Sequence, residues 1–135
     1  MGHTIRVLLV EDNPGDAELA REYIKETGHR VDIVTIDDGQ LAIDFFKDVG
    51  NNVVRCPDLV LVDLNLPRRS GHEVTKAARR CCGKLKVFIY SGSKSPEDLK
   101  QAEGNGVDGY LVKPMVWAEI EATIKELGAI LRSLE

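Results

Sequence analysis

The sequence predicts an α/β fold in which a parallel five-stranded sheet lies between two layers of helices, a three-layer sandwich. Short apolar runs rich in β-branched residues alternate along the chain with amphipathic stretches of helical length. Most of these runs are continuously apolar, as is typical of strands buried on both faces. The chain has 135 residues, 43 % of them hydrophobic, which is enough for one domain with its own core and too little for a second.

Five apolar runs are predicted as strands because each is short and bounded by turn-forming residues or by the start of a helical pattern. The predicted strands cover residues 5–10, 31–36, 59–62, 86–90 and 109–112.

The first two predicted helices follow the first two strands. The first begins near Pro14, with Asn13 as its cap, and ends at Gly28. The second runs from about Asp38 and stops at Gly50. The residues expected to face the core are Ala17, Ala20, Tyr23 and Ile24 in the first helix, and Leu41, Ala42, Phe45, Phe46 and Val49 in the second.

Three further helices complete the pattern. The third runs from residue 70 or 71 to Cys82. The fourth has the clearest start, because Ser95 is a capping hydroxyl and Pro96 suits the first turn. Its body, residues 99–103, has few apolar side chains, so we expect it to be loosely held. The last helix runs from Trp117 to about Leu134, with one apolar stripe formed by Ile120, Ile124, Leu127 and Leu131.

Alternation of strands and helices implies right-handed crossovers and a parallel sheet. The expected strand order is 2-1-3-4-5, which places the topological switch between the first and third strands. Ligands of such sheets bind outside the carboxyl ends of the strands at that point. Asp12 follows the first strand and Asp63 follows the third, so both acids are expected at the site.

Five polar side chains gather at this carboxyl edge: Glu11, Asp12, Asp63, Ser91 and Lys113. Clustered carboxylates repel unless a pKa is raised or a cation binds. An oxygen-only ligand set with open positions favours hydrated Mg²⁺. A carboxylate beside a metal ion and a lysine can also accept a phosphoryl group. Phosphoryl transfer to Asp63 is therefore the leading chemistry.

These residues bring the chain close to a known family. It resembles a response-regulator receiver domain, which has a flavodoxin-like fold, from Val7 to about Leu134. The matching motifs are Val-Glu-Asp-Asn-Pro at 10–14, Asp-Leu-Asn-Leu-Pro at 63–67 followed by Gly71, Ser-Gly at 91–92, and Tyr-Leu-Val-Lys-Pro at 110–114.

The resemblance implies a role for each site residue. Asp63 would be phosphorylated, and Glu11, Asp12, Asp63 and the backbone carbonyl of Asn65 would hold Mg²⁺, for which Mn²⁺ can substitute. Two residues would contact the phosphoryl oxygens, Ser91 by a hydrogen bond and Lys113 by its charge. Ser91 and Tyr110 would form the conformational switch, and the peptide bond between Lys113 and Pro114 would be cis.

The resemblance also implies a function: a single-domain response regulator of a two-component phosphorelay, with no output domain in residues 1–135 and a core at about 5–134. It would accept its phosphoryl group from a sensor histidine kinase and would not otherwise be an enzyme. The fourth helix, fifth strand and fifth helix would contact a downstream protein, a histidine phosphotransfer protein or a second copy of the chain. The motifs at 11–14 and 63–67 are similar to those of stand-alone regulators, of the chemotaxis type or partners of phytochrome-type kinases.

Plainer interpretations remain for single residues. Asp12 can be a helix cap, Ser91 a turn residue and Tyr110 a packing residue of its strand. Two other function classes fit less well. A haloacid-dehalogenase phosphatase needs a second acid two residues after its nucleophile, where this chain has Asn65. A flavodoxin-like cofactor module needs a phosphate loop after the first strand, where Glu11 and Asp12 would repel a flavin phosphate.

Composition excludes several further classes. The formal net charge of −4 argues against direct nucleic-acid binding. No segment reads as a signal peptide or a membrane span, so we expect a cytoplasmic protein. The cysteines lack metal-ligand spacing and are odd in number, and we expect them to be reduced: Cys56, Cys81 and Cys82. The histidines are expected at the surface: His3, His29 and His72.

Overall fold

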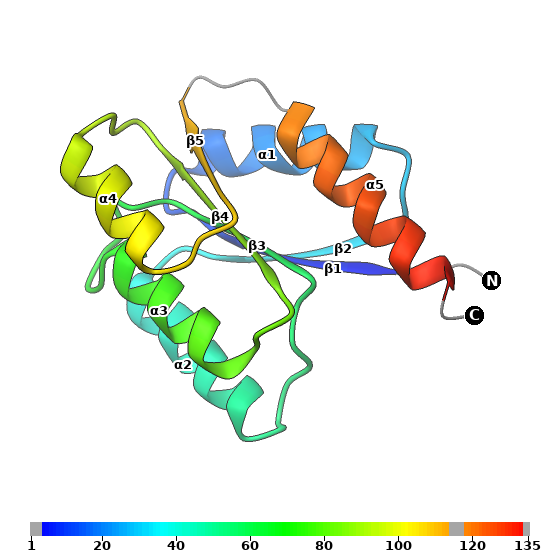
Figure 1. Ribbon diagram of the computed structural model, residues 1–135, viewed down its shortest axis with the longest axis horizontal. Helices are drawn as coiled ribbons and strands as arrows, with labels where there is room; N and C mark the ends of the chain where they lie inside the picture. The colour runs from blue at the N-terminus through cyan, green and yellow to red at the C-terminus, as the bar shows by residue number, and fades with distance from the viewer. Residues whose placement is uncertain (1–3, 114–117, 134–135) are drawn as a thin grey trace.

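The computed structural model describes residues 4–113 and 118–133 and has the predicted three-layer architecture (Figure 1). All five strands are parallel and are ordered β2-β1-β3-β4-β5. Both the fold class and the strand order are thus confirmed. The elements are β1 (Ile5–Val10), α1 (Pro14–Glu26), β2 (Val31–Ile36), α2 (Gly39–Gly50), β3 (Leu59–Val62), α3 (Gly71–Cys81), β4 (Lys86–Ser91), α4 (Pro96–Gly104), β5 (Gly109–Val112) and α5 (Ala118–Ser133).

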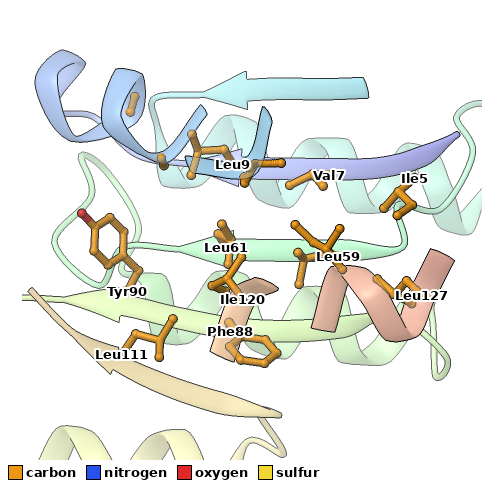
Figure 2. Close-up of a cluster of buried hydrophobic side chains, with 14 residues drawn as sticks. Ile5, Val7, Leu9, Leu59, Leu61, Phe88, Tyr90, Leu111, Ile120 and Leu127 are labelled. Atoms are coloured by element: carbon orange, nitrogen blue, oxygen red, sulfur yellow. The ribbon is translucent and has the colours of Figure 1, made fainter. Parts of the chain in front are cut away.

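Two large apolar clusters, one on each face of the sheet, form most of the core, and a small third cluster joins Leu64, Ile89 and Ala102. Alternate side chains of a strand point to opposite faces, so β1 and β3 contribute to both clusters. In one large cluster, Ile120 of α5 lies beside Leu61 of β3 and Phe88 of β4, and Leu9 of β1 belongs to the same cluster (Figure 2). In the other, the sheet packs against α2 and α3 through residues such as Phe46 and Val74. Figure 1 shows the same division, with α1 and α5 on one side and α2 and α3 on the other.

Side-chain caps fix the helix starts at the predicted positions. Asn13 Oδ1 accepts a hydrogen bond from the backbone N–H of Asp16 (2.9 Å), and Ser95 Oγ accepts one from that of Asp98 (3.1 Å). At α3, Ser70 and Glu73 form a reciprocal capping box. These caps satisfy N–H groups that have no partner within the helix, which is why the starts could be predicted from the sequence.

Two of the residues expected in the core lie at the surface instead. Tyr23 of α1 is 37 % exposed and Leu41 of α2 is 48 % exposed. In α1 the buried residues are Ala17, Ala20 and Ile24, a narrow stripe in which Tyr23 falls to one side. In α4 the buried residue is Ala102, which agrees with the few apolar side chains of this helix, and its loose attachment stays a prediction. In the part of the chain that the structure describes, no helix is long and apolar enough to cross a membrane.

The cysteines depart from expectation. Cys56 and Cys82 form a disulfide, with their Cα atoms 6.7 Å apart, and only Cys81 is free. Cys56 precedes β3 and Cys82 follows α3, and the crossover through this strand and helix returns the chain to the edge of the sheet from which β3 starts. The expectation of reduced thiols rested on number and spacing along the sequence, neither of which reveals a contact made by a crossover.

Candidate functional site

The backbone brings the predicted site residues to one edge of the sheet. The N–H of Asp63 donates to the carbonyl of Val10 (2.9 Å), which places the end of β3 beside that of β1. In the same way, the N–H of Lys113 donates to the carbonyl of Ser91 (2.8 Å) and joins β5 to β4. Four chain segments that are distant in sequence therefore converge where the topology predicts a site.

Three carboxylates form an oxygen cluster at this edge. Glu11, Asp12 and Asp63 each offer one carboxylate oxygen, and these atoms lie within 4.8 Å of one another. Glu11 is 2 % exposed and Asp63 is 6 % exposed, whereas Asp12 faces solvent. A hard divalent cation such as Mg²⁺ prefers such oxygen donors and retains water on its open side. The side chains of Glu11, Asp12 and Asp63, predicted as metal ligands, are therefore suited to hold a divalent cation.

Lys113 is the cation of the pocket. Its Nζ lies 2.8 Å from Glu11 Oε1, 2.8 Å from Asp16 Oδ2 and 3.2 Å from Asp63 Oδ2. Asp16 was not predicted at the site, because its place in the first turn of α1 has a sufficient explanation in the helix dipole. The first turn of α1 follows directly after the carboxyl end of β1, the sheet edge at which Lys113 was expected. This proximity is the signal that could have identified Asp16 as a site residue.

Burial and mutual repulsion shift the titration of this cluster. Burial, followed by the hydrogen bond to Asp63, raises the pKa of Glu11 to about 7, and the ammonium of Lys113 opposes the rise. For Lys113, burial disfavours the charge, but its bonds to Asp16 and Glu11 outweigh this and raise its pKa. One ammonium is thus held among carboxylates that it cannot fully neutralise, which is the electrostatic setting in which a second cation binds.

The segment after Asp63 keeps the carboxylate in place. The backbone N–H of Asn65 donates to Asp63 Oδ1 (3.2 Å). The role assigned to the Asn65 carbonyl as a metal ligand stays a prediction. Behind Asp63, α3 starts so close that a Cβ added to Gly71 would lie 2.2 Å from the Asp63 carbonyl oxygen. Only glycine allows this approach, so Gly71 fixes how α3 packs against the backbone of Asp63.

Ser91 and Tyr110 meet at the segment between β4 and α4. Ser91 is completely buried, and its Oγ accepts a hydrogen bond from the N–H of Ser93 (3.1 Å). The Tyr110 hydroxyl donates to the Ser93 carbonyl (3.0 Å). The two predicted switch residues are therefore linked through Ser93. Pro114, and with it the predicted cis peptide, lies outside the described residues, as does Trp117.

His72 corrects an expectation. The residue was expected at the surface, but it is 7 % exposed, and its Nε2 lies 2.9 Å from Asp98 Oδ1. The capping box at Ser70 fixes the start of α3, and the side chain of the second helical residue then points inward towards α4. Absence of ligand spacing, the basis of the expectation, carries no information on burial.

Comparison with known proteins identifies the family of the chain. The sequence profile described as "Response regulator receiver domain" matches residues 7–125. The chain is 32 % identical over 123 residues to the probable methanogenesis regulatory protein FilR2 of Methanothrix harundinacea (strain 6Ac). The matched region covers 90 % of this chain and 79 % of FilR2. It is 35 % identical over 120 residues to the cell cycle response regulator CtrA of Brucella ovis, covering 89 % of this chain and 48 % of CtrA, so the chain spans about half the length of that relative.

Solved structures show the same fold. The phosphorylated cyanobacterial phytochrome response regulator RcpA has a TM-score of 0.75 and 27 % identity, over 98 % of this chain and 97 % of that one. The Mn²⁺-bound form of the response regulator Rcp1 has a TM-score of 0.73 and 27 % identity, over 91 % of each chain.

Proposed function

Because the chain belongs to the response regulator receiver domain family, we propose that it is a phosphorylation switch of a two-component system, with Asp63 as the residue that accepts a phosphoryl group from a histidine kinase. Receiver domains act as phosphoacceptor switches between histidine kinases and downstream effectors. The observation that carries the proposal is the arrangement around Asp63: a buried carboxylate 3.2 Å from Lys113 and within one oxygen cluster with Glu11 and Asp12.

Each residue has a chemical task in the transfer. An oxygen of Asp63 attacks the phosphorus of the donor phosphohistidine, and the phosphorus–nitrogen bond breaks as the new phosphorus–oxygen bond forms. Lys113 turns from the carboxylates to one phosphoryl oxygen, and Ser91 donates its hydroxyl proton to another. Mg²⁺ bound by Glu11, Asp12, Asp63 and the Asn65 carbonyl would neutralise charge on the transferred group. The similar response regulator Rcp1 has a Mn²⁺-bound form, which supports a divalent ion as a cofactor of this chain.

The signal would leave the pocket through α4, β5 and α5. Ser93 is bonded to both Ser91 and Tyr110, so a movement of Ser91 towards a phosphoryl group is transmitted to the segment that precedes α4. Because Ala102 is the buried residue of α4, little apolar packing resists displacement of this helix. A downstream protein, a histidine phosphotransfer protein or a second copy of the chain would read the resulting surface.

A phosphodonor assay tests the proposal. Acetyl phosphate and Mg²⁺ should add one phosphoryl group to the intact protein, detected by mass spectrometry, and the adduct should be absent from Asp63→Asn and from samples with chelator. As a matched control, Asp44→Asn changes an exposed acid on α2 and should be labelled like the wild type. A wild-type protein that is neither labelled nor able to bind beryllofluoride would overturn the proposed function.

A further inference from the structure

His72 is a buried imidazole outside the oxygen cluster, and the transfer chemistry makes no use of it. It is the second residue of α3, and its Nε2 lies 2.9 Å from Asp98 Oδ1 in the first turn of α4. Its other ring nitrogen, Nδ1, is also buried and has no hydrogen-bond partner among the described residues. An unpaired buried polar atom costs free energy. The bond from Nε2 to Asp98 is therefore the hydrogen bond that holds this buried ring among the described residues.

Asp98 is held in its charged form by its neighbours. Hydrogen bonds from Ser93 and then from His72 lower its pKa, so above acid pH the carboxylate can only accept. It follows that His72 donates through Nε2–H to one carboxylate oxygen, while the Ser93 hydroxyl donates to the other (2.5 Å). The Asp98 carboxylate thus joins His72 to Ser93, because each of these residues donates a hydrogen bond to one of its oxygens.

Ser93 continues the chain of bonds into the phosphoacceptor pocket. Its N–H donates to Ser91 Oγ (3.1 Å). Between these two serines lies Gly92, where an added Cβ would meet no atom within 4 Å. The bond from the Ser93 N–H connects Ser91 Oγ to the segment that precedes α4. On the other side, His72 directly follows Gly71, the residue packed against the Asp63 carbonyl.

From this chain of contacts we infer that His72 is a positioning residue for the phosphoryl-transfer site. Through Asp98 and Ser93 it holds the Ser91 hydroxyl where a phosphoryl oxygen arrives, and it fixes the start of α4 to the same helix that packs against Asp63. The inference rests on the proposed function for its effect on rate, but the bond network itself is independent of phosphorylation. Figure 1 shows α3 and α4 on the same side of the sheet, as this link requires.

Four variants separate positioning from packing. His72→Ala removes both the ring and the bond, His72→Leu restores apolar volume without a donor, and His72→Gln restores an N–H donor. Asp98→Ala removes the acceptor. The rate of labelling by acetyl phosphate should fall about five- to tenfold in His72→Ala, His72→Leu and Asp98→Ala, the effect of one lost hydrogen bond. His72→Gln should recover most of the rate.

Four further measurements make the test specific. His72→Leu should melt close to the wild-type temperature despite its slow labelling, and Mg²⁺ affinity should be unchanged in all four variants. The double variant His72→Ala/Asp98→Ala should be no slower than either single variant, because both remove the same link. Hydrogen exchange of the Ser93 amide, measured without phosphodonor, should accelerate in His72→Ala and not in His72→Gln.

The outcomes distinguish the two proposals. If the wild type is not labelled, the proposed function fails, and the Ser93 exchange rates still report on the link. The positioning role is overturned if labelled wild type and His72→Leu react at the same rate, if the effects of the two single variants add in the double variant, or if Ser93 exchange is unchanged.

Discussion

At the scale of single residues, the pocket has more negative charge than Lys113 can neutralise. Four carboxylates, those of Glu11, Asp12, Asp16 and Asp63, surround or adjoin this one ammonium. Asp63→Asn should therefore stabilise the metal-free protein by about 1–2 kcal/mol and raise Tm by roughly 3–8 °C, since it removes one charge and keeps an oxygen that can accept from Lys113. Thermal unfolding in chelator measures this, with Asp44→Asn as the control. A lower or unchanged Tm would mean that the acids are weakly coupled.

Glu11 makes the same pocket sensitive to pH. Its pKa is raised by burial from 4.5 to about 7, so between these values the folded protein keeps a proton that the unfolded chain has lost. This contribution to stability is complete below 4.5 and disappears as the pH rises through 7. Metal-free wild type should therefore lose stability between pH 5 and 7.5 relative to Glu11→Gln, which has no such proton. Denaturant titrations of both proteins at the two pH values decide this, and parallel curves would contradict it.

Mg²⁺ affinity should have the opposite pH dependence. A cation that binds the Glu11 carboxylate must displace its proton, so affinity should rise about tenfold per pH unit below pH 7 and level off above it. Isothermal titration of Mg²⁺ between pH 5.5 and 8 measures the slope. A flat profile would show that the metal leaves the Glu11 proton in place.

Residues at the sheet edge could be predicted because each follows an apolar strand, and a charge there is conspicuous. Asp16 and His72 could not be identified in this way. Both stand in first turns of helices, where a polar side chain has an adequate local explanation, and their partners lie 97 and 26 residues away in sequence. The information that the sequence lacks is which distant segments the fold brings together, β5 with α1 for Asp16 and α3 with α4 for His72, and periodicity does not encode this.

At the scale of elements, the start of α3 is a tightly constrained junction. A Cβ at Gly71 would meet the Asp63 carbonyl oxygen at 2.2 Å and Leu64 Cα at 2.7 Å, both backbone atoms that cannot rotate away. Gly71→Ala should therefore destabilise the protein by about 2–3 kcal/mol and slow labelling of Asp63, because α3 and the β3–α3 segment must separate. Gly83→Ala is the matched control, since a Cβ there meets nothing within 4 Å. Equal stability of the two variants would contradict the packing argument.

The helices also show where sequence patterns suffice and where they fail. Caps are local, so the starts of α1, α3 and α4 agree with their predicted positions. The width of the buried stripe of a helix depends on how the helix is oriented against the sheet, which the sequence does not specify. For this reason Tyr23 and Leu41 were wrongly assigned to the core. The Cys56–Cys82 pairing depends on a crossover returning to its starting edge, a property of the assembled sheet.

At the scale of the whole molecule, the two apolar clusters share the strands β1 and β3, whose side chains alternate between them. Neither face of the sheet can lose its helices without exposing the other side of the same strands. We therefore propose that residues 1–135 form a single domain and expect one cooperative thermal transition, with far- and near-ultraviolet circular dichroism giving the same midpoint. Separate midpoints would indicate two independently folding units. The strand order could be predicted from the alternation and the handedness of the connections, because few other arrangements of four crossovers are allowed.

The placement of Lys113 suggests that metal binding precedes phosphoryl transfer at this site. Its one nitrogen is engaged by Glu11, Asp16 and Asp63 together, so a phosphodonor that arrives first meets an ammonium already committed elsewhere. Under the proposed function, Lys113 would become available only after a divalent ion has neutralised the charge of these acids. The protein would thus remain unreactive towards phosphodonors until it has bound metal, and the side chain of Lys113 would make phosphoryl transfer depend on metal binding.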